Sequence, residues 1–366
     1  METVCNRCVM DTTAKNIRFN EKGICNFCLD YEKSLLKLNA AKFNLDELVD
    51  RIRKDGKGKE YDCIVGVSGG VDSSYVLLKA KELGLRPLAV HLDNGWNSDL
   101  ATKNISNLVE KLNADLFTYV IDWEEYKDLQ KSFFKANVVD IEMLMDNAML
   151  SVNYSQAKKY GIKNILSGFN ASTEGMNFPD GWNHLKFDAK NIRNIQKKFG
   201  TKKIKTFPII STIDFIKYEK VSKIHWYPFL DFFNYNKEDA LKELEEKVGY
   251  IRYPYKHYES VFTRFYQAYI LPKKFNIDKR KLHLSTLIIS NQMSRDEAML
   301  LLKQSPYPNV ELEKSDKDFV LKKLDFTEES FENYIKSPAV PHEAYGSEKK
   351  FFDFCFNFYH KFIKKD

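Results

Sequence analysis

A short apolar run, YDCIVGV, is followed at once by the loop SGGVDSS and by an amphipathic segment that ends at Gly84. The apolar run with its β-branched residues predicts a strand, and the amphipathic segment predicts a helix. The alternation continues with the strand-like LAVHL, a helical segment over 100–112, the strand-like LFTYVI, a further helix and NILSG. Strands that alternate with helices predict an α/β fold with a parallel sheet, whose ligands bind beyond the carboxyl ends of the strands.

The SGGVDSS loop has the composition of an anion-binding site. Its two glycines let backbone N–H groups approach an anion, and the helix that begins near Ser73 points its positive dipole end at the same place. We interpret Asp72 as a ligand of Mg²⁺ that bridges to a triphosphate. The loop matches neither a Walker A sequence nor GxGxxG, and a serine-rich turn without a ligand is the alternative. The loop residues predicted to bind the nucleotide are Ser68, Gly69, Gly70, Asp72, Ser73 and Ser74.

Four of the six cysteines lie within the first thirty residues, as CNRC, sixteen further residues, and CNFC. Each C-x-x-C pair can form a tight knuckle, and two knuckles complete a closed tetrahedral shell of thiolates around one ion. Such a shell is typical of a structural zinc site and leaves no coordination position for catalysis. We therefore predict a zinc ribbon, with two disulfides or an iron centre as alternatives. The predicted Zn²⁺ ligands are Cys5, Cys8, Cys25 and Cys28.

The length of 366 residues suggests two or three domains of a soluble globular protein. No run approaches the roughly 18 apolar residues of a transmembrane helix, and the first residues have no export signal, so we expect a cytoplasmic protein without membrane insertion. The 57 Lys and Arg against 51 Asp and Glu permit an anionic small substrate and require no nucleic acid. We predict a ribbon with a connecting helix over 1–53, a linker over 54–60, a nucleotide-binding domain over 61–229 and a helical domain over 230–366.

With its preceding strand and the following LAVHLDNGW, the SGGVDSS loop resembles the PP-loop of the ATP pyrophosphatase superfamily. That superfamily includes asparagine, GMP and NAD synthetases and tRNA thiolases. The resemblance implies a Rossmann-like fold of the adenine nucleotide alpha hydrolase type. It also implies that a substrate oxygen attacks the α-phosphate of ATP, pyrophosphate leaves, and a nitrogen or sulfur nucleophile then displaces AMP. Nucleotide contacts are implied for His91, Asp93 and Asn94 at the end of the second strand and for Gly168. For His91, a satisfied side chain at a strand end is the alternative.

Several separate segments narrow this resemblance. The four-cysteine ribbon, HLDNGWNS, LSGFNASTEGM, KHYESVFTRFYQ and FNIDKRKLHLS together are similar to the N-acetyl sugar amidotransferase family. This family acts in surface-polysaccharide and lipopolysaccharide biosynthesis, where it converts an acetamido group of a sugar into an acetamidino group. The resemblance covers nearly the whole chain. It implies ATP, Mg²⁺ and structural Zn²⁺ as cofactors and a nucleotide-activated N-acetyl sugar as the substrate.

The chemistry of such a conversion sets requirements for the site. An N-acetyl amide resists ammonia because resonance stabilises its carbonyl and its oxygen is a poor leaving group, and adenylylation of that oxygen removes both obstacles. The site needs cations near the α-phosphate and an acid or base near the incoming nitrogen. Glu174 follows a predicted fourth strand, where it would deliver a carboxylate to the site. An exposed loop glutamate is the alternative.

Later cations complete the candidate site. Lys279 and Arg280 open a predicted helix, where the dipole disfavours cations, so an anionic ligand explains them better than solvent does. A solvated face is the alternative. With Asp72 and Glu174 they form the predicted catalytic set. We assign substrate binding to three cationic residues close to aromatic ones, Lys256, His257 and Arg264, of which Arg264 suits a phosphate or carboxylate of the sugar substrate.

The chain has no cysteine suited to hydrolysing glutamine. Four cysteines are assigned to the metal, Cys63 lies in a predicted buried strand, and Cys355 lies in the aromatic, helical tail. The family resemblance points to a separate glutaminase subunit with a cyclase-like barrel subunit that together supply ammonia. Two other classes stay open. One is a tRNA thiolase, which commonly needs catalytic cysteines or an iron-sulfur cluster, and the other is a non-catalytic nucleotide-binding scaffold.

Overall fold

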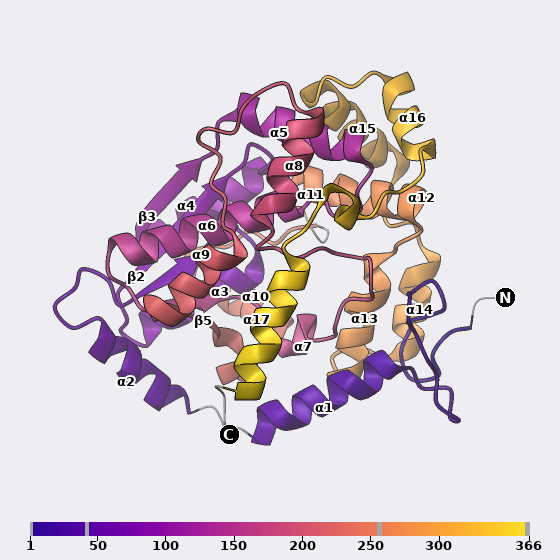
Figure 1. Ribbon diagram of the computed structural model, residues 1–366. Helices are drawn as coiled ribbons and strands as arrows, with labels where there is room; N and C mark the ends of the chain where they lie inside the picture. The colour runs from indigo at the N-terminus through magenta and orange to yellow at the C-terminus, as the bar shows by residue number, and fades with distance from the viewer. Residues whose placement is uncertain (1–2, 41–43, 255–257, 363–366) are drawn as a thin grey trace.

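A five-stranded parallel sheet lies toward one side of the computed structural model, which describes residues 3–40, 44–254 and 258–362 (Figure 1). The strand order is β3-β2-β1-β4-β5, and each neighbouring pair is parallel. The α/β fold that the alternation predicts is therefore confirmed. The strands are β1 (Cys63–Gly66), β2 (Pro87–Asp93), β3 (Asp115–Val120), β4 (Asn164–Ser167) and β5 (His225–Pro228).

The strand order reverses between β1 and β4. From β1 the chain adds β2 and then β3 on one side, and it returns to add β4 and β5 on the other. In the register of the sheet, Ile64 of β1 lies opposite Leu88 of β2 and Ile165 of β4. Ligands of doubly wound sheets bind at such a reversal, beyond the carboxyl ends of the strands. SGGVDSS follows β1 and SGFNASTEG follows β4, so both lie at this edge.

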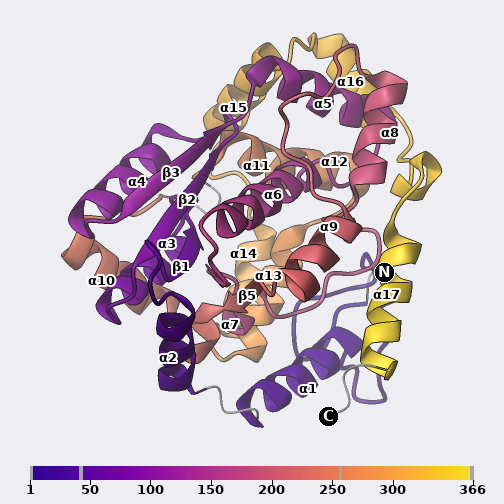
Figure 2. The same cartoon turned by 60° about the vertical axis from the view of Figure 1, so that its left-hand side comes forward.

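Helices cover both faces of the sheet because alternate strand residues are buried on opposite sides (Figure 2). Cys63 and Val65 pack with one set of helices, and Ile64 packs with the other. On the first face lie α3 (Val71–Glu82), α4 (Asp99–Lys111) and α10 (Lys237–Val248). On the second lie α6 (Met143–Lys159), α9 (Thr212–Ile216) and the π-helix η1 (Lys217–Val221).

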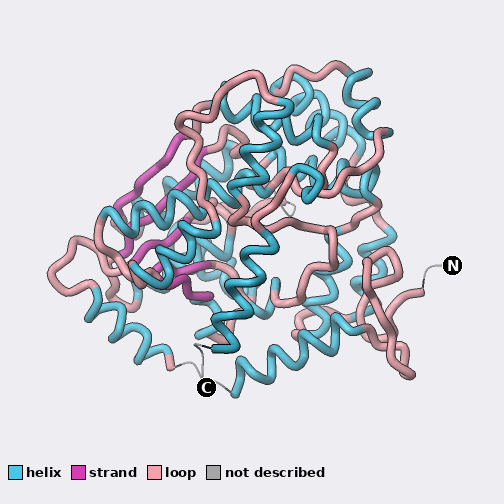
Figure 3. Tube along the Cα trace, in the orientation of Figure 1, coloured by secondary structure: helices cyan, strands magenta, loops and turns pink. Residues whose placement is uncertain are grey.

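The chain from residue 229 onward is mainly helical, as the sequence predicts (Figure 3). The further helices are, in chain order, α5 (Trp123–Ala136), α7 (Ala171–Glu174), α8 (Ala189–Phe199), α11 (Val261–Phe265), α12 (Leu271–Phe275), α13 (Lys279–Ile289), α14 (Arg295–Lys303), α15 (Val310–Lys323), α16 (Glu328–Lys336) and α17 (Lys349–Phe362). Helices α11, α12, α13, α15 and α16 share one large core with the N-terminal ribbon, α5 and α8. Single turns of other helix types are η2 (Phe229–Phe232), η3 (Tyr266–Ile270) and η4 (His342–Tyr345).

The charged stretch between ribbon and sheet forms two helices instead of one. They are α1 (Asn26–Ala40) and α2 (Leu45–Asp55). Asn44 explains the second start, because its side chain accepts hydrogen bonds from the backbone N–H groups of Asp46 and Glu47. The predicted linker over 54–60 begins inside α2, because Lys54 and Asp55 are the last two residues of that helix. The domain limits themselves stay predictions.

The ribbon docks on the C-terminal helices α13 and α14, far away in sequence (Figure 1). The Val9 N–H donates to Ser285 Oγ at 3.2 Å, and Lys281 forms an ion pair with Asp11. Arg295 donates from Nη2 to the Cys5 carbonyl at 3.0 Å and from Nε to the Cys8 carbonyl at 3.1 Å. The first and last predicted domains are therefore in direct contact.

The aromatic tail helix α17 packs on one side only. Phe352 stacks on Phe187 at 6.3 Å between ring centroids, whereas other phenylalanines of α17 are exposed. Phe352 is half-buried against Phe187 and Phe215, so among the described residues α17 covers the protein with one ring, and the prediction of a partner face stays open for the exposed phenylalanines. Across the three described stretches of chain, no helix has the length and apolar character to cross a bilayer. The exposed phenylalanines of α17 are Phe351, Phe354, Phe356 and Phe358.

Candidate functional site

The four N-terminal cysteines converge as the knuckle spacing predicts. All four side chains are fully buried, and their four Sγ atoms lie within 4.8 Å of one another. The Sγ–Sγ distances are 3.9 Å for Cys5–Cys28, 3.7 Å for Cys8–Cys25 and 3.6 Å for Cys25–Cys28. A tetrahedron with Zn–S bonds of about 2.3 Å has edges of about 3.8 Å, whereas a disulfide needs about 2.05 Å. The donor set therefore fits a tetrahedral metal ion, and the disulfide alternative is wrong.

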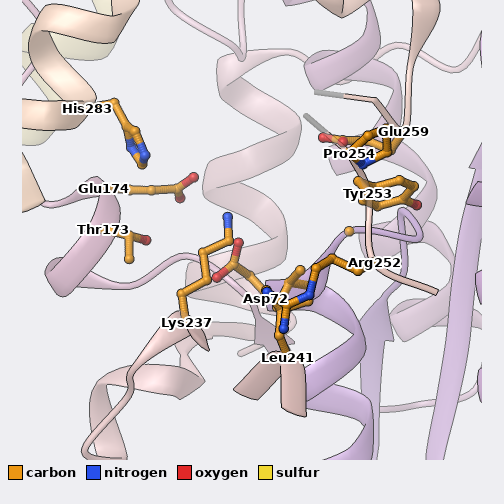
Figure 4. A pocket seen from close by; sticks show the side chains of 12 residues that line it. Asp72, Thr173, Glu174, Lys237, Leu241, Arg252, Tyr253, Pro254, Glu259 and His283 are labelled. Atoms are coloured by element: carbon orange, nitrogen blue, oxygen red, sulfur yellow. The ribbon is translucent and has the colours of Figure 1, made fainter. Parts of the chain in front are cut away.

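A cavity of about 400 Å³ lies at the carboxyl ends of β1 and β4, and we call it the loop cavity (Figure 4). Figure 4 shows Thr173, Glu174 and His283 on one side, with Arg252 and Tyr253 on the other. The cavity brings together two of the predicted catalytic residues, Asp72 and Glu174. Its lining residues are Gly70, Val71, Asp72, Thr173, Glu174, Lys237, Leu241, Arg252, Tyr253, Pro254, Glu259 and His283.

Hydrogen bonds to its backbone fix the conformation of the SGGVDSS loop (68–74). Gly69 has a φ of +82°, and a Cβ there would lie 2.9 Å from the Ala101 carbonyl oxygen, so only glycine fits. The hydroxyls of Tyr250 and Tyr253 donate to the Gly69 carbonyl at 2.9 and 2.7 Å. Helix α3 begins after Gly70 without a side-chain capping hydrogen bond. The N–H groups of its first turn and its positive dipole end therefore lie at the loop cavity, where they can bind an anion.

The three serines of the loop have different positions. Ser68 and Ser73 place their Oγ atoms 3.2 Å apart, and Ser68 Oγ also accepts from the Gly70 N–H at 3.3 Å. Ser74 is fully buried, and among the described residues its hydroxyl has no hydrogen-bond partner. Ser68 and Ser73 thus present hydroxyls within the loop. Ser74 points into the protein, because the first turn of α3 directs it inward, so its predicted contact with the nucleotide has no support in this geometry.

Asp72 lies in the loop cavity and receives a hydrogen bond from the Tyr235 hydroxyl at Oδ1. Burial, and then the negative charge of Asp72, raise the pKa of Tyr235 well above its ordinary value, so the phenol stays a donor. Gly168 follows β4 and touches the start of α3. A Cβ at Gly168 would lie 3.0 Å from backbone atoms of Asp72 and Ser73. The turn at Ser167 and Gly168, which we call the SG turn, is therefore in direct contact with the SGGVDSS loop.

Glu174 is the last residue of α7, a single turn fixed by contacts on several sides. Asn170 caps this turn, and the Ala171 N–H donates to Asp231 Oδ1 at 2.7 Å. The hydroxyl of Ser290, just after α13, donates to the Ser172 carbonyl at 2.8 Å. These contacts place the Glu174 carboxylate in the cavity, near the imidazole of His283 from α13 (Figure 4).

The residues predicted at the end of β2 make hydrogen bonds within the protein. His91 is buried, with Nδ1 2.8 Å from the Val67 carbonyl and Nε2 3.0 Å from Asn97 Nδ2. Asp93 Oδ1 accepts from the Gly95 N–H at 2.9 Å, and Asn94 Oδ1 accepts from the Trp96 N–H at 3.0 Å. For His91 the geometry favours the alternative of a satisfied side chain. Contacts of these three residues with a nucleotide stay predictions.

The predicted cations Arg264, Lys279 and Arg280 line a second cavity, which we call the helical cavity. It has a volume of about 570 Å³ and shares His283 with the loop cavity. Lys279 pairs with Glu142 at 3.0 Å, and Arg280 pairs with Asp278 at 2.7 Å. These carboxylates offset the cations at the start of α13, so an anionic ligand is not needed to explain them. Lys256 and His257 lie outside the described residues. The helical cavity is lined by Arg264, Gln267, Ala268, Lys279, Arg280, His283, Leu284, Leu287, Met293, Leu301, Gln304, Ser305, Pro306 and Pro308.

Sequence reasoning missed five charged or titratable residues of the loop cavity, Lys237, Arg252, Tyr253, Glu259 and His283. Lys237 is the first residue of α10 and directs its amine toward Asp72 in Figure 4. Arg252 follows α10 and pairs with Glu238 and Glu245. His283 lies one helical turn after Lys279, so a reading at i, i+4 spacing would have included it. No comparable signal exists for Lys237 or Arg252, because only the packing of α10 on α3 brings them to the loop.

Fold and site together define an α/β protein with the glycine-rich SGGVDSS loop after β1 and a four-cysteine ribbon that can hold a metal. Residues 259–362 match the family described as LPS biosynthesis protein WbpG-like, C-terminal domain. This stretch of the chain is therefore similar to the C-terminal domain of WbpG-like proteins of lipopolysaccharide biosynthesis, which confirms the resemblance to a surface-glycan family that the sequence suggests. No curated protein matches the chain.

Solved structures with related outlines include two synthetases. NMN synthetase from Francisella tularensis is 18% identical, with a TM-score of 0.29, over 58% of this chain and 99% of that one. NH3-dependent NAD synthetase from Campylobacter jejuni is 16% identical, with a TM-score of 0.30, over 57% of this chain and 87% of that one. A predicted tRNA methyltransferase subunit from Methanocaldococcus jannaschii is 13% identical, with a TM-score of 0.29, over 50% and 75%. Likenesses at these TM-scores support no conclusion about function.

Proposed function

We propose that the chain is an ATP-dependent, AMP-forming amidotransferase that acts on a nucleotide-activated N-acetyl sugar. It adenylylates the acetamido oxygen and replaces that oxygen with ammonia nitrogen, which gives an acetamidino sugar. The observation that carries the proposal is the loop cavity, where the uncapped start of α3 meets Asp72, Glu174 and His283. The WbpG-like C-terminal domain supports a substrate from surface-glycan biosynthesis.

The first step needs a site that favours a leaving pyrophosphate. The N–H groups at the start of α3 and the Lys237 amine would hold phosphate oxygens, which replaces the lysine that a Walker A loop supplies. Asp72 would hold Mg²⁺, which neutralises phosphate charge when bound. The acetamido oxygen attacks the α-phosphorus, the bond to the pyrophosphate oxygen breaks, and an O-adenylylated imidate forms, which is cationic until its N–H proton is lost to solvent.

The second step needs a base and a donor near the imidate carbon. Ammonia adds to this carbon through its lone pair, and the C–O bond to AMP then breaks, so the oxygen that began on the sugar leaves with AMP. Glu174 would accept a proton from the incoming nitrogen, and His283 beside it would hold or move that proton (Figure 4). The product is an amidine, AMP and the released pyrophosphate.

The four-cysteine cluster is separate from this chemistry. We propose that it binds Zn²⁺ in a structural role, because all four sulfurs are buried and complete a closed tetrahedral set. Cys63 is buried in β1, and Cys355 lies on α17, so neither lines the loop cavity. A thiolase with a catalytic cysteine beside the nucleotide is therefore disfavoured. We propose ammonia supply by a separate glutaminase subunit and a cyclase-like barrel subunit, and a cytoplasmic location.

An isotope experiment tests the proposal. The protein is incubated with ATP, Mg²⁺, ammonium chloride and a panel of nucleotide-activated N-acetyl sugars labelled with oxygen-18 in the acetamido carbonyl. We expect the mass change of C=O to C=NH in one sugar and transfer of the label to AMP. The Asp72→Asn variant should lose the activity, whereas Asp99→Asn, a matched change in the first turn of α4, should keep it. ADP as the main product, or unlabelled AMP, would contradict the mechanism.

A further inference from the structure

The helical cavity has a size and lining suited to a small ligand. Its volume of about 570 Å³ lies within the ordinary range of ligand sites. Leu284, Leu287 and Met293 give it an apolar wall, and residues 301–308 form a largely exposed rim. The cavity lies wholly between residues 264 and 308, so it belongs to the stretch that matches the WbpG-like C-terminal domain.

Charge is balanced inside this cavity. Arg264 pairs with Asp316 at 2.6 Å, Lys279 with Glu142 at 3.0 Å, and Arg280 with Asp278 at 2.7 Å. Arg280 also donates from Nη1 to the Gln304 carbonyl at 2.9 Å, which fixes the end of α14. Since each cation is paired with a carboxylate behind the lining, a pyrophosphate in this cavity would gain less than it would from three free cations. The lining instead suits a neutral ligand with hydroxyl or amide groups and an apolar side.

One polar group in the cavity wall lacks a partner. The Arg264 side chain is 8% exposed, and its Nε and Nη2 atoms donate to Asp316 at 2.6 and 2.7 Å. Within the described part of the chain, its Nη1 is buried without a hydrogen-bond partner. An unsatisfied buried donor costs about 1 to 3 kcal/mol. Since Nη1 has no surface open to the cavity, Arg264 fixes the wall through Asp316, and the groups open to a ligand are those of Gln267 and the rim.

We propose that the helical cavity binds the N-acetylated sugar ring itself, and not its charged nucleotide carrier. The inference rests on the proposed function. The acetyl methyl and the apolar ring face would contact the Leu and Met wall, and ring hydroxyls or the amide would meet Gln267 and the rim. His283 lines both cavities, so the two adjoin, and a sugar held here would turn its acetamido group toward the loop cavity, where ATP would bind.

Direct binding tests the inference without turnover. The probes are the methyl glycosides of N-acetylglucosamine, N-acetylgalactosamine and N-acetylmannosamine, each followed by saturation-transfer NMR on the full chain. We expect at least one glycoside to bind, with the strongest transfer to its acetyl methyl. UDP alone should not displace it. Binding of none of the three, or displacement by UDP, would overturn the inference.

Two variants place the binding in the cavity. Leu287→Trp fills the wall, and Gln304→Trp blocks the exposed rim, where a larger side chain does not endanger folding. Each should weaken glycoside binding at least tenfold and leave the Kd for ATP unchanged. Leu300→Trp adds the same indole to α14, where Leu300 is 60% exposed and outside the cavity lining, and it should bind like the parent.

The outcomes separate the inference from the proposed function. Glycoside binding that both tryptophan variants abolish, without any amidine product, would sink the proposed function and keep the sugar site. Amidine formation with an unchanged KM for the sugar in folded Leu287→Trp and Gln304→Trp would keep the function and sink the sugar site.

Discussion

Replacement of Gly168 by alanine tests whether the contact between the SG turn and α3 sets the geometry for ATP. The new Cβ would lie 3.0 Å from Asp72 C and Ser73 N, whereas ordinary contacts begin at 3.4 Å. The start of α3 must therefore move by about 0.4 Å, because backbone atoms cannot rotate aside as a side chain can. Overpacking of this kind costs about 1 to 3 kcal/mol of stability.

The same displacement moves the N–H groups that would hold the phosphates. Each 1.4 kcal/mol of lost transition-state stabilisation is about a tenfold loss of rate, so we expect kcat/KM for ATP to fall about ten- to a hundredfold. Pyrophosphate release measures this, and urea unfolding measures stability in parallel. Gly84→Ala is the matched control. Gly84 follows the other end of α3 with a φ of +68°, so alanine there costs about 1 to 2 kcal/mol without moving the loop. A rate of pyrophosphate release by Gly168→Ala equal to that of the unchanged protein would refute the reasoning.

Three further predictions concern the metal, the ammonia source and pH. Cys25→Ser should lower the zinc content and stability of the purified protein, and full zinc content by elemental analysis would contradict the four-sulfur site. The purified chain should form amidine from ammonium but not from glutamine, and an added glutaminase and barrel pair should restore glutamine use; glutamine-dependent turnover by the chain alone would oppose this. Burial, and then the electrostatic interaction with His184, whose ring stacks on it at 4.2 Å between centroids, lower the pKa of His342 to about 3. The unfolded chain then binds the extra proton below about pH 6.5, so this residue alone should remove about 2 kcal/mol of stability between pH 7 and pH 5. Urea unfolding at both pH values should show a smaller pH effect in His342→Gln, and an equal effect would count against the assignment.

Local sequence patterns were sufficient for the fold class and for half of the site. The strand, the glycine-rich loop and the helix are consecutive in sequence, so their arrangement near Asp72 follows from the chain itself. The cysteine knuckles are local in the same way. Glu174 could be expected because it follows a strand of the same sheet. These elements need no knowledge of how distant segments pack.

The remainder of the site depends on contacts between distant segments. Lys237 reaches the loop cavity only because α10 packs on α3, and His283 only because α13 packs on α7. The carboxylate that offsets Lys279 comes from Glu142, which lies 137 residues earlier. A sequence read in order therefore suggests an anionic ligand where the folded chain already has an ion pair.

The docking of the ribbon on α13 and α14 has a consequence for synthesis of the chain. Val9 forms its hydrogen bond with Ser285, which is synthesised 276 residues later. At about 5 to 20 residues per second, the ribosome needs about 14 to 55 s to make that stretch. The knuckles themselves close within the first 28 residues, so they can capture their ion long before the partner surface exists. During this interval the ribbon is a preassembled piece with an uncovered face, and the emergence of Arg295 allows its attachment. A chain that stops short of α14 would leave that face open to chaperones and proteases.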